Sequence, residues 1–311
     1  MTFANFFSSD ATAEPCTTAL ELVCPVNSLV TLRTAVDHGA DWIRLDHSMH
    51  DPAGGLADLN PASAIITRGI RYAHDKNRRV LLAIRSDMQP SSWGKLRDMI
   101  DCAARWGVDA IALSDPSLML YAVAQHPHLG LHFEIQEASL DDGTINFFQQ
   151  RVGVSRVLLP RILTLAQVAR IAANTSVELQ VTGFGKQSAL VAGSKRPLPV
   201  EQHMDSRETN NTLDTDCANL CGTAEHAVND SCFVLEKSPG TGALKLLPQL
   251  TALGVRAIQV EALEYGSTHL AQVTRVWREA VDECLENLDH YAVKPSWIAG
   301  LRGATLDRRS S

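Results

Sequence analysis

The sequence contains no apolar run long enough to cross a membrane and carries no excess of basic residues. No stretch of about 18 consecutive apolar residues occurs in the 311-residue chain, which argues against a membrane-spanning helix. The 28 Lys and Arg are outnumbered by 35 Asp and Glu, so the formal net charge is -7. Non-specific binding to nucleic acid needs clustered basic side chains that neutralise phosphates. The composition therefore does not favour nucleic acid as a partner.

The sequence also lacks a secretion signal and a paired set of cysteines. Residues 1–18 have no Lys or Arg before their apolar residues, and Asp10 and Glu14 interrupt them, unlike a signal peptide. The seven cysteines are odd in number and spread along a long chain, which argues against a secreted disulfide framework. We expect a cytoplasmic protein in which residues 1–18 form a flexible leader.

The composition does provide enough apolar material for a large core. Hydrophobic residues make up 45% of the chain and charged residues 20%, which is typical of a soluble globular protein. A chain of this length forms either one large α/β barrel or two medium domains. The order of the predicted elements decides between these two possibilities.

Short apolar runs alternate with longer segments of helical periodicity from residue 20 onward. This alternation is typical of parallel strands joined by crossover helices. Eight runs are predicted as strands: 20–24, 42–45, 80–84, 110–113, 131–135, 156–159, 177–181 and 257–260. No glycine-rich turn follows the first run, which argues against an open doubly wound sheet. The sequence predicts an α/β fold, a (β/α)8 barrel of the TIM-barrel type over residues 19–290.

Prolines set several of the expected element limits. Pro25 is expected to close the first strand, and Pro248 to interrupt a helix over 244–253 only after its first turn. Beyond Lys294 the sequence has no clear pattern, so residues 291–311 are predicted to form a disordered tail.

Helix caps and core positions are also predicted. Ser28 and Asp115 are the expected N-terminal caps of two helices. Ile65, Leu120 and Val123 recur at helical spacing and are expected to pack in the core.

A long segment after the seventh strand, residues 183–240, carries three clustered cysteines. Cys217, Cys221 and Cys232 fall within sixteen residues, which in a reducing compartment indicates metal or cluster ligation more often than a disulfide. The alternative is ordinary thiols in a long surface loop. Because the loops after the strands carry the chemistry of such barrels, we expect this insert to form a lid or small subdomain there.

Several stretches of the chain resemble the collagenase-like peptidase U32 family, within it the branch of the UbiU and YhbU proteins. The resemblance covers about residues 19 to 285. The matching stretches are Glu21–Pro25, Leu29–Asp41, Gly69–His74, Trp106–Pro116, Val157–Arg161, Val177–Gly185, Leu246–Leu250, Gly254–Ile258 and Ala271–Glu279.

The resemblance implies a barrel that carries a four-cysteine [4Fe-4S] cluster. UbiU-like members act with a UbiV-like sister subunit, as a heterodimer, in oxygen-independent hydroxylation during ubiquinone biosynthesis. A quinone precursor or another small molecule would then be the substrate. Other branches of the family are linked to RNA hydroxylation or to peptide hydrolysis.

The expected cluster ligands are only partly present. Aligned on the glycines after the seventh strand, Ser188 and Lys195 occupy the positions of two family cysteines, and neither is a good iron ligand. Cys217 or Cys221 matches the third ligand, and Cys232 is the candidate for the fourth. Three thiols completed by another side chain would hold a cluster or a zinc ion, and an empty site is the alternative. The candidates for that further ligand are His203 and His226.

Two residues at strand ends are the candidate catalytic groups. Glu261 follows the eighth strand, where the family has Lys-Ile-Glu-Gly-Arg and this chain reads Gln-Val-Glu-Ala-Leu, so the glutamate is kept while both basic residues are lost. Gln136, after the fifth strand, matches a glutamine of the family. Glu134 and Glu137 flank it and are candidates for an acid–base pair with Glu261.

A polar segment after the second strand offers a possible metal site. His47 and His50, with Asp46 and Asp51, stand where a barrel metal site is usually built. Without a third partner fixed by the sequence, a solvated loop is the favoured interpretation.

Two other functions stay open. The loss of the expected ligands is consistent with a divergent paralogue that has no cluster and acts as a non-catalytic partner or regulatory subunit. Peptide hydrolysis lacks a recognisable nucleophile–base pair, and no Gly-x-Ser-x-Gly elbow occurs.

Overall fold

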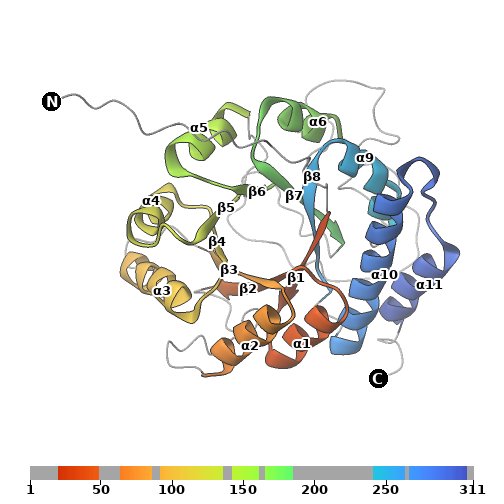
Figure 1. Cartoon of the computed structure of the whole chain (residues 1–311), viewed down its shortest axis with the longest axis horizontal. Coiled ribbons are helices and arrows are strands. Elements are labelled where there is room, and N and C mark those ends of the chain that lie inside the picture. Colours follow the sequence, from red (N-terminus) through yellow and green to blue (C-terminus); the bar gives the residue numbers. More distant parts are fainter. Residues whose placement is uncertain are drawn as a thin grey trace, which may run out of the picture.

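The protein is a closed barrel of eight parallel strands surrounded by helices (Figure 1). The computed structural model describes residues 20–48, 64–85, 92–135, 142–160, 165–184, 241–262 and 266–306. The strands follow one another around the barrel in sequence order: β1 (Glu21–Val26), β2 (Trp42–Ser48), β3 (Arg79–Arg85), β4 (Ala110–Leu113), β5 (Gly130–Glu134), β6 (Arg156–Leu158), β7 (Glu178–Phe184) and β8 (Val255–Val260). The predicted (β/α)8 fold is confirmed.

Helices cover the outside of the barrel (Figure 1). They are α1 (Leu29–Asp37), α2 (Ala64–Asp75), α3 (Trp93–Trp106), α4 (Pro116–Gln125), α5 (Asp142–Val152), α6 (Leu165–Asn174), α8 (Thr241–Lys245), α9 (Leu247–Ala252), α10 (Ser267–Glu286), the short 3-10 helix η3 (Leu288–His290) and α11 (Pro295–Leu306). Both predicted caps are present. Ser28 forms a capping box with Thr31, and the Asp115 side chain accepts from the backbone of Ser117 and Leu118.

The apolar core has two parts. The larger lies between the outer face of the strands and the helices, and includes the inner face of α10 with Trp277, which is fully buried. The smaller lies inside the barrel: Val23, Trp42, Leu81, Ala83, Ala110, Ala112 and Ala257. Four of these seven are alanines, so this layer leaves room for larger polar side chains from the other strands.

Pro25 lies inside β1 and does not end it, contrary to the expectation from sequence. Pro25 and Val26 pair with β2, whereas pairing with β8 stops at Val23. Beyond Val23 the strand is hydrogen-bonded to a neighbour on one side only, so a residue without an N–H leaves no gap on the other side.

The helix expected over 244–253 is divided in two. Pro248 lies in the first turn of α9. Proline is tolerated there because the N–H groups of a first turn have no acceptor within the helix. The turn at Leu246 separates α9 from α8, so the proline begins a new helix where we expected it to interrupt an existing one.

The predicted disordered tail is largely helical. Helix α11 packs beside α10 (Figure 1), and Trp297 and Leu301 on its inner face are 2% and 1% exposed. The indole N–H of Trp297 donates to Glu279 Oε2 at 3.2 Å. Residues 307–311 lie outside the described residues.

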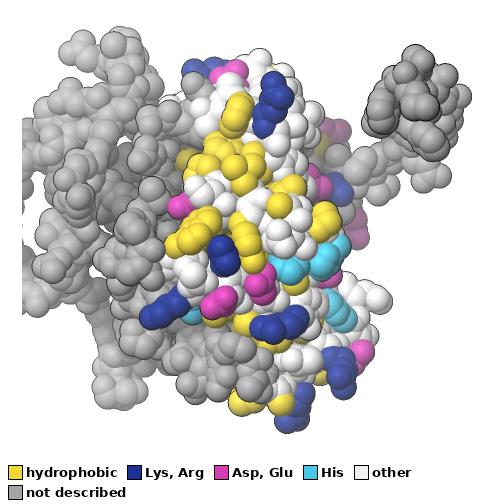
Figure 2. All heavy atoms as spheres, turned by 90° about the vertical axis from the view of Figure 1, so that its left-hand side faces the viewer, with side chains coloured by type: hydrophobic (Ala, Val, Ile, Leu, Met, Phe, Trp, Pro, Cys, Tyr) yellow, Lys and Arg dark blue, Asp and Glu magenta, His cyan; other side chains and the backbone are white. Residues whose placement is uncertain are grey.

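Three predicted core residues are on the surface. Ile65 of α2 is 53% exposed, and Leu120 and Val123 of α4 are 57% and 39% exposed. Figure 2 looks onto the side covered by α3, α4 and α5 and shows hydrophobic side chains among charged ones and histidines. Phe147 of α5 adds to this exposed apolar surface.

In the part of the chain that the structure describes, no helix has the length and apolar character needed to cross a membrane. The predicted leader, residues 1–18, lies outside the described residues. The same is true of residues 185–240, which make up nearly all of the predicted insert.

Candidate active site at the barrel mouth

The carboxyl ends of the eight strands meet at one end of the barrel, which we call the mouth. In barrels of this type the chemistry is carried at this end. Side chains at alternate positions of β2 point into the barrel, since successive residues of a strand face opposite sides. These are Trp42, Arg44 and Asp46, which follow one another toward the mouth.

Arg44 is the centre of a polar network below the mouth. Its side chain is 1% exposed, and its guanidinium donates to Asp46 Oδ1 from Nε at 2.9 Å and from Nη2 at 2.8 Å. Nη2 also donates to Glu134 Oε2 at 2.8 Å. Because β2 and β5 are not neighbours, this bond crosses the barrel interior. Arg44 therefore holds two carboxylates that come from different strands.

Two glutamines extend the network to the other side of the barrel. Arg44 Nη1 donates to Gln259 Oε1 at 3.3 Å, and Gln180 Nε2 donates to the same oxygen at 3.1 Å. Gln259 Nε2 in turn donates to Glu261 Oε1 at 2.8 Å, just beyond the end of β8. Glu134 and Glu261 thus belong to one connected set of side chains.

The network keeps a permanent positive charge among three carboxylates. Burial of the Arg44 guanidinium tends to lower its pKa, but Asp46 and Glu134 outweigh this and raise the pKa above the ordinary arginine value. Arg85 lies at the end of β3, with Nη2 4.0 Å from Glu134 Oε1. Arg44 and Arg85 therefore supply positive charge near the mouth from β2 and β3, although the two basic residues of the family motif at the end of β8 are absent.

This arrangement presents carboxylate oxygens to whatever enters the mouth. The side chains of Asp46 and Glu134 are 20% and 16% exposed, so part of each carboxylate remains accessible. Carboxylates held in place by a buried guanidinium can accept hydrogen bonds from a substrate or remove a proton from it. The mouth is therefore suited to acid–base chemistry on a polar substrate.

His132 lies on β5 two residues before Glu134 and points into the same interior. Its ring meets Trp42 edge-on, with ring centroids 5.3 Å apart, and it is 5% exposed. Burial lowers its pKa well below the ordinary value, and the nearby charges of Arg156, Arg79 and Arg44 lower it further. Its Nδ1 is buried without a hydrogen-bond partner. The imidazole is therefore neutral in the folded protein.

The possible metal site after the second strand is not formed by the two of its residues that the structure describes, Asp46 and His47. Strand β2 continues to Ser48, so Asp46 and His47 are strand residues on opposite faces. Asp46 bonds to Arg44, whereas burial lowers the pKa of His47. His50 and Asp51 lie outside the described residues.

The described cysteines are not placed as ligands. Cys24, Cys102 and Cys284 are buried free thiols. Burial raises the pKa of Cys24 to about 12, which suppresses the thiolate that binds metals. Within the ranges that the structure describes, no group of three or more His, Cys, Asp or Glu is placed to hold a metal ion.

The predicted cluster segment lies outside the described residues. This applies to all the candidate ligands and to the two positions where the family has cysteines and this chain does not. They are Cys217, Cys221, Cys232, His203 and His226, and Ser188 and Lys195. Iron–sulfur binding is therefore still a prediction.

Of the two candidate catalytic residues, Glu261 lies at the mouth and Gln136 lies outside the described residues, as does Glu137. Arg44 and Gln259 were not singled out as site residues from the sequence. A signal was present, because a polar residue at every second position of an otherwise apolar strand indicates a polar barrel interior.

Curated proteins with similar sequences include two tRNA hydroxylation proteins. Protein P2 of Bacillus subtilis is 25% identical over 253 residues, which cover 75% of this chain and 77% of that protein. Protein P of Escherichia coli is 22% identical over 318 residues, covering 85% of this chain and 68% of that protein. The chain thus spans two thirds to three quarters of the length of these two relatives.

Among solved structures, tryptophan synthase of Mycobacterium tuberculosis matches with a TM-score of 0.51 at 13% identity, over 85% of this chain and 94% of the other. This likeness shows the barrel fold alone. The sequence profile described as Peptidase family U32 matches residues 27–308. This match covers most of the barrel, including both strands that supply Arg44 and Gln259. The chain belongs to Peptidase family U32.

Proposed function

We propose that this chain acts in the oxygen-independent hydroxylation of RNA, and that the reaction takes place at the barrel mouth. The observation that carries the proposal is the match of tRNA hydroxylation proteins to most of the chain. It is supported by the network around Arg44, which holds accessible carboxylates at the end where barrels carry their chemistry.

The proposal replaces the expectation that nucleic acid is not a partner. That expectation came from the net charge of -7, which describes the whole chain. Recognition of one folded RNA needs basic side chains on one face and contacts to an exposed base, both of which an acidic protein can provide.

In this proposal the residues at the mouth have separate roles. Glu134 and Glu261 contact the base, as acceptors of its N–H groups or of a proton released during the reaction. Arg44 and Gln259 are positioning residues, because each bonds to one of these carboxylates from below. The chemistry of oxygen insertion itself would belong to the predicted iron–sulfur cluster.

The test is complementation of an Escherichia coli strain that lacks its tRNA hydroxylation protein P. We expect the chain to restore hydroxylated nucleosides in digested tRNA, measured by mass spectrometry. Glu134→Gln should reduce them at least about tenfold, since a well-placed general acid or base contributes this much or more. The matched control is Glu286→Gln, an exposed glutamate at the end of α10.

Two results would contradict the proposal. One is a strain that produces the chain as folded protein, with its partner genes supplied, and shows no hydroxylated nucleoside. The other is an equal loss of product in Glu134→Gln and Glu286→Gln. The ubiquinone role and the UbiV-like sister subunit remain predictions from the resemblance. Quinone analysis of a deletion strain grown without oxygen tests the first, and co-purification tests the second.

A bound [4Fe-4S] cluster remains a prediction that concerns Cys217, Cys221 and Cys232. Iron and sulfide analysis of protein purified without oxygen tests it. Absence of both would favour the alternative, a paralogue that has lost the cluster and serves as a non-catalytic subunit.

A further inference from the structure

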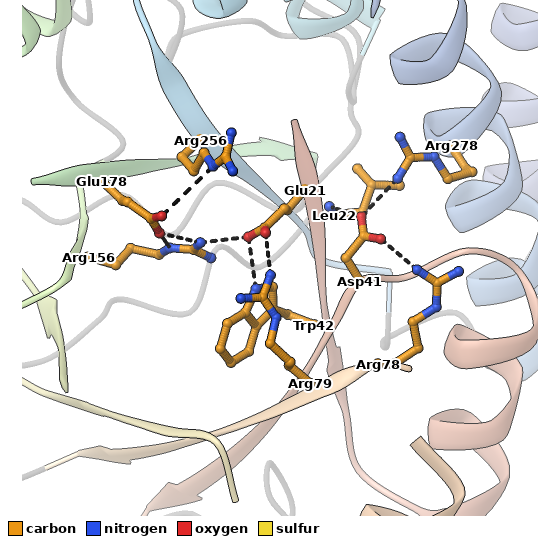
Figure 3. Close-up of polar contacts among 10 residues, drawn as sticks. All are labelled: Glu21, Leu22, Asp41, Trp42, Arg78, Arg79, Arg156, Glu178, Arg256 and Arg278. Atoms are coloured by element: carbon orange, nitrogen blue, oxygen red, sulfur yellow. Dashed lines mark hydrogen bonds and ion pairs between the residues drawn. The ribbon is translucent and has the colours of Figure 1, made fainter. Parts of the chain in front are cut away.

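The amino ends of the strands form the other end of the barrel, which we call the floor, and arginines gather there (Figure 3). Five lie together: Arg78, Arg79, Arg156, Arg256 and Arg278. Their carboxylate partners are Glu21, Asp41, Glu178 and Asp282. Among these nine side chains there is one more positive than negative charge.

A cavity of about 460 Å³ opens at the floor between β1, the start of β3 and α10. Its charged lining is Arg78, Arg79, Arg278, Glu21, Asp41 and Asp282. Sites for small ligands are commonly hollows of about 300 to 1,000 Å³ with a few convergent polar groups. The cavity is thus large enough for a small molecule and is lined by three guanidinium groups.

Two of the three carboxylates in this lining, Glu21 and Asp41, have little capacity left for a ligand, whereas the third, Asp282, is 54% exposed and bonds to Arg278 Nη2 through Oδ1 at 2.6 Å. Glu21 Oε2 accepts from Trp42 Nε1 at 2.9 Å and from Arg156 Nη2 at 2.6 Å, while Oε1 accepts from Arg79. Asp41 Oδ2 accepts from the backbone of Leu22 at 2.9 Å.

Both oxygens of Asp41 are in fact engaged. Oδ2 also accepts from Arg278 Nη1 at 2.8 Å, and Oδ1 accepts from Arg78 Nη1 at 2.7 Å. The negative charges of Glu21 and Asp41 are therefore neutralised within the protein, and their stronger acceptor positions are filled.

The arginines, in contrast, keep unused donors. A guanidinium has five N–H groups, and in the hydrogen bonds described Arg78 and Arg79 each donate from one nitrogen. Their side chains are 34% and 47% exposed, so the remaining donors are accessible. A ligand rich in anionic oxygens supplies acceptors for these donors.

The fold holds these arginines in place without a ligand. Arg79 lies over the Trp42 ring, 4.2 Å from its centroid. Arg278 crosses the turn at Gly39, where φ is +100° and an added Cβ would stand 2.7 Å from Arg278 Cγ. Because these donors are already held in place, a ligand that binds them loses little free energy to the ordering of side chains.

We propose that the floor cavity binds a small oxyanion, a molecule that carries phosphate or carboxylate groups. Arg78 and Arg79 are its donors, Arg278 holds Asp41 and Asp282 beside them, and the site is separate from the barrel mouth. The proposal does not depend on the reaction proposed for the mouth.

Isothermal titration calorimetry of the full chain with pyrophosphate, inorganic phosphate and citrate tests the proposal. We expect saturable binding of at least one of them. Arg78→Gln should weaken this binding about tenfold, the usual effect of losing one hydrogen bond to a charged group. The matched control is Arg170→Gln, an exposed arginine of α6, which should leave binding unchanged.

The three titrants separate the sources of the oxyanion. Binding of the two phosphates alone assigns a phosphate ligand, and binding of citrate alone assigns a polycarboxylate. Arg79→Gln is the second variant, to be used if Arg78→Gln does not melt cooperatively. The proposal is overturned if no titrant binds the wild-type chain, or if Arg170→Gln weakens binding as much as the cavity variants do. Displacement of pyrophosphate by a short single-stranded RNA of higher affinity would also overturn it, in favour of an RNA-backbone site.

Discussion

Arg44 and His132 lie in the barrel interior in neighbouring layers and differ in what burial does to them. Arg44 stays charged because Asp46 and Glu134 surround it, whereas burial and the nearby charges of Arg156, Arg79 and Arg44 all lower the pKa of His132. A charged imidazole at this position would be both buried and repelled. The folded state therefore favours the neutral form of His132.

This preference makes stability depend on pH. The folded pKa of His132 is lowered well below the ordinary value of 6.5, so below that pH the unfolded chain binds a proton that the folded chain does not. Stability should fall as the pH drops below 6.5, by up to about 1.4 kcal/mol per pH unit from this one group. His132→Phe should reduce this slope, measured by urea unfolding at several pH values between 5 and 7.

The control is His128→Gln, because His128 is exposed on the surface after α4. This variant should keep the slope of the wild-type protein. An unchanged slope in His132→Phe would show that other groups cause the acid sensitivity.

Sequence reasoning located some of these residues and missed others for a physical reason. Glu261 was found because it directly follows a predicted strand and matches a glutamate in a short motif of the family, and both are local information. Arg44 was missed because its partners Glu134 and Gln259 lie 90 and 215 residues away along the chain. A buried charge is explained by the partners that neutralise it, and of those around Arg44 only Asp46 is near in the sequence.

At the scale of elements, the periodicity of the sequence predicted well where helices form, and less well which face of each helix is buried. Helix α4 has apolar residues on several sides, so its pattern did not determine which side faces the core. Leu118 and Met119 face inward, while Leu120 and Val123 face solvent. Helix α10 has a clear pattern, and the apolar residues that recur at helical spacing along it are buried, among them Val273 and Trp277.

Helix α11 was missed because it is short of polar residues and so shows no amphipathic pattern. Its attachment depends on Trp297, which is 2% exposed and stacks with Tyr291 at a centroid distance of 6.1 Å. Trp297→Ala should lower the free energy of unfolding by roughly 3 kcal/mol, the lower part of the range for large buried side chains. Chemical denaturation measures this loss.

The neighbouring residue provides the control for this helix. Ser296 is exposed, so Ser296→Ala should change stability by less than about 0.5 kcal/mol. If Trp297→Ala were equally neutral, α11 would not contribute to the stability of the barrel.

At the scale of the whole molecule, the barrel is closed by the pairing of β1 with β8, from Glu21 and Ala257 to Val23 and Gln259. The fold was predictable because the order of strands and helices is local information and a right-handed parallel barrel is its direct consequence. The polar layers at the mouth and the floor were not, because their side chains meet across the barrel.

Glu21 is the residue through which distant strands are joined at the floor. From β1 it accepts hydrogen bonds from Trp42 of β2, Arg79 of β3 and Arg156 of β6. Burial alone would raise its pKa, but Arg156, Arg79 and the Trp42 hydrogen bond hold the pKa below the ordinary value of 4.5. The carboxylate therefore stabilises the fold above pH 4.5, and this stabilisation is lost as the pH falls through the lowered folded value.

Glu21→Gln should consequently lower the free energy of unfolding at pH 7 by about 2 to 3 kcal/mol, the value of a hydrogen bond to a charged group. The difference in unfolding free energy between the variant and the wild type should shrink as the pH is lowered below 4.5, because the protonated wild-type side chain is then neutral, like glutamine. Urea unfolding at pH 7 and at pH 3.5 measures both effects, with Glu286→Gln as the exposed control. A difference that stayed the same at both pH values would mean that the side-chain shape at position 21, and not its charge, joins the strands.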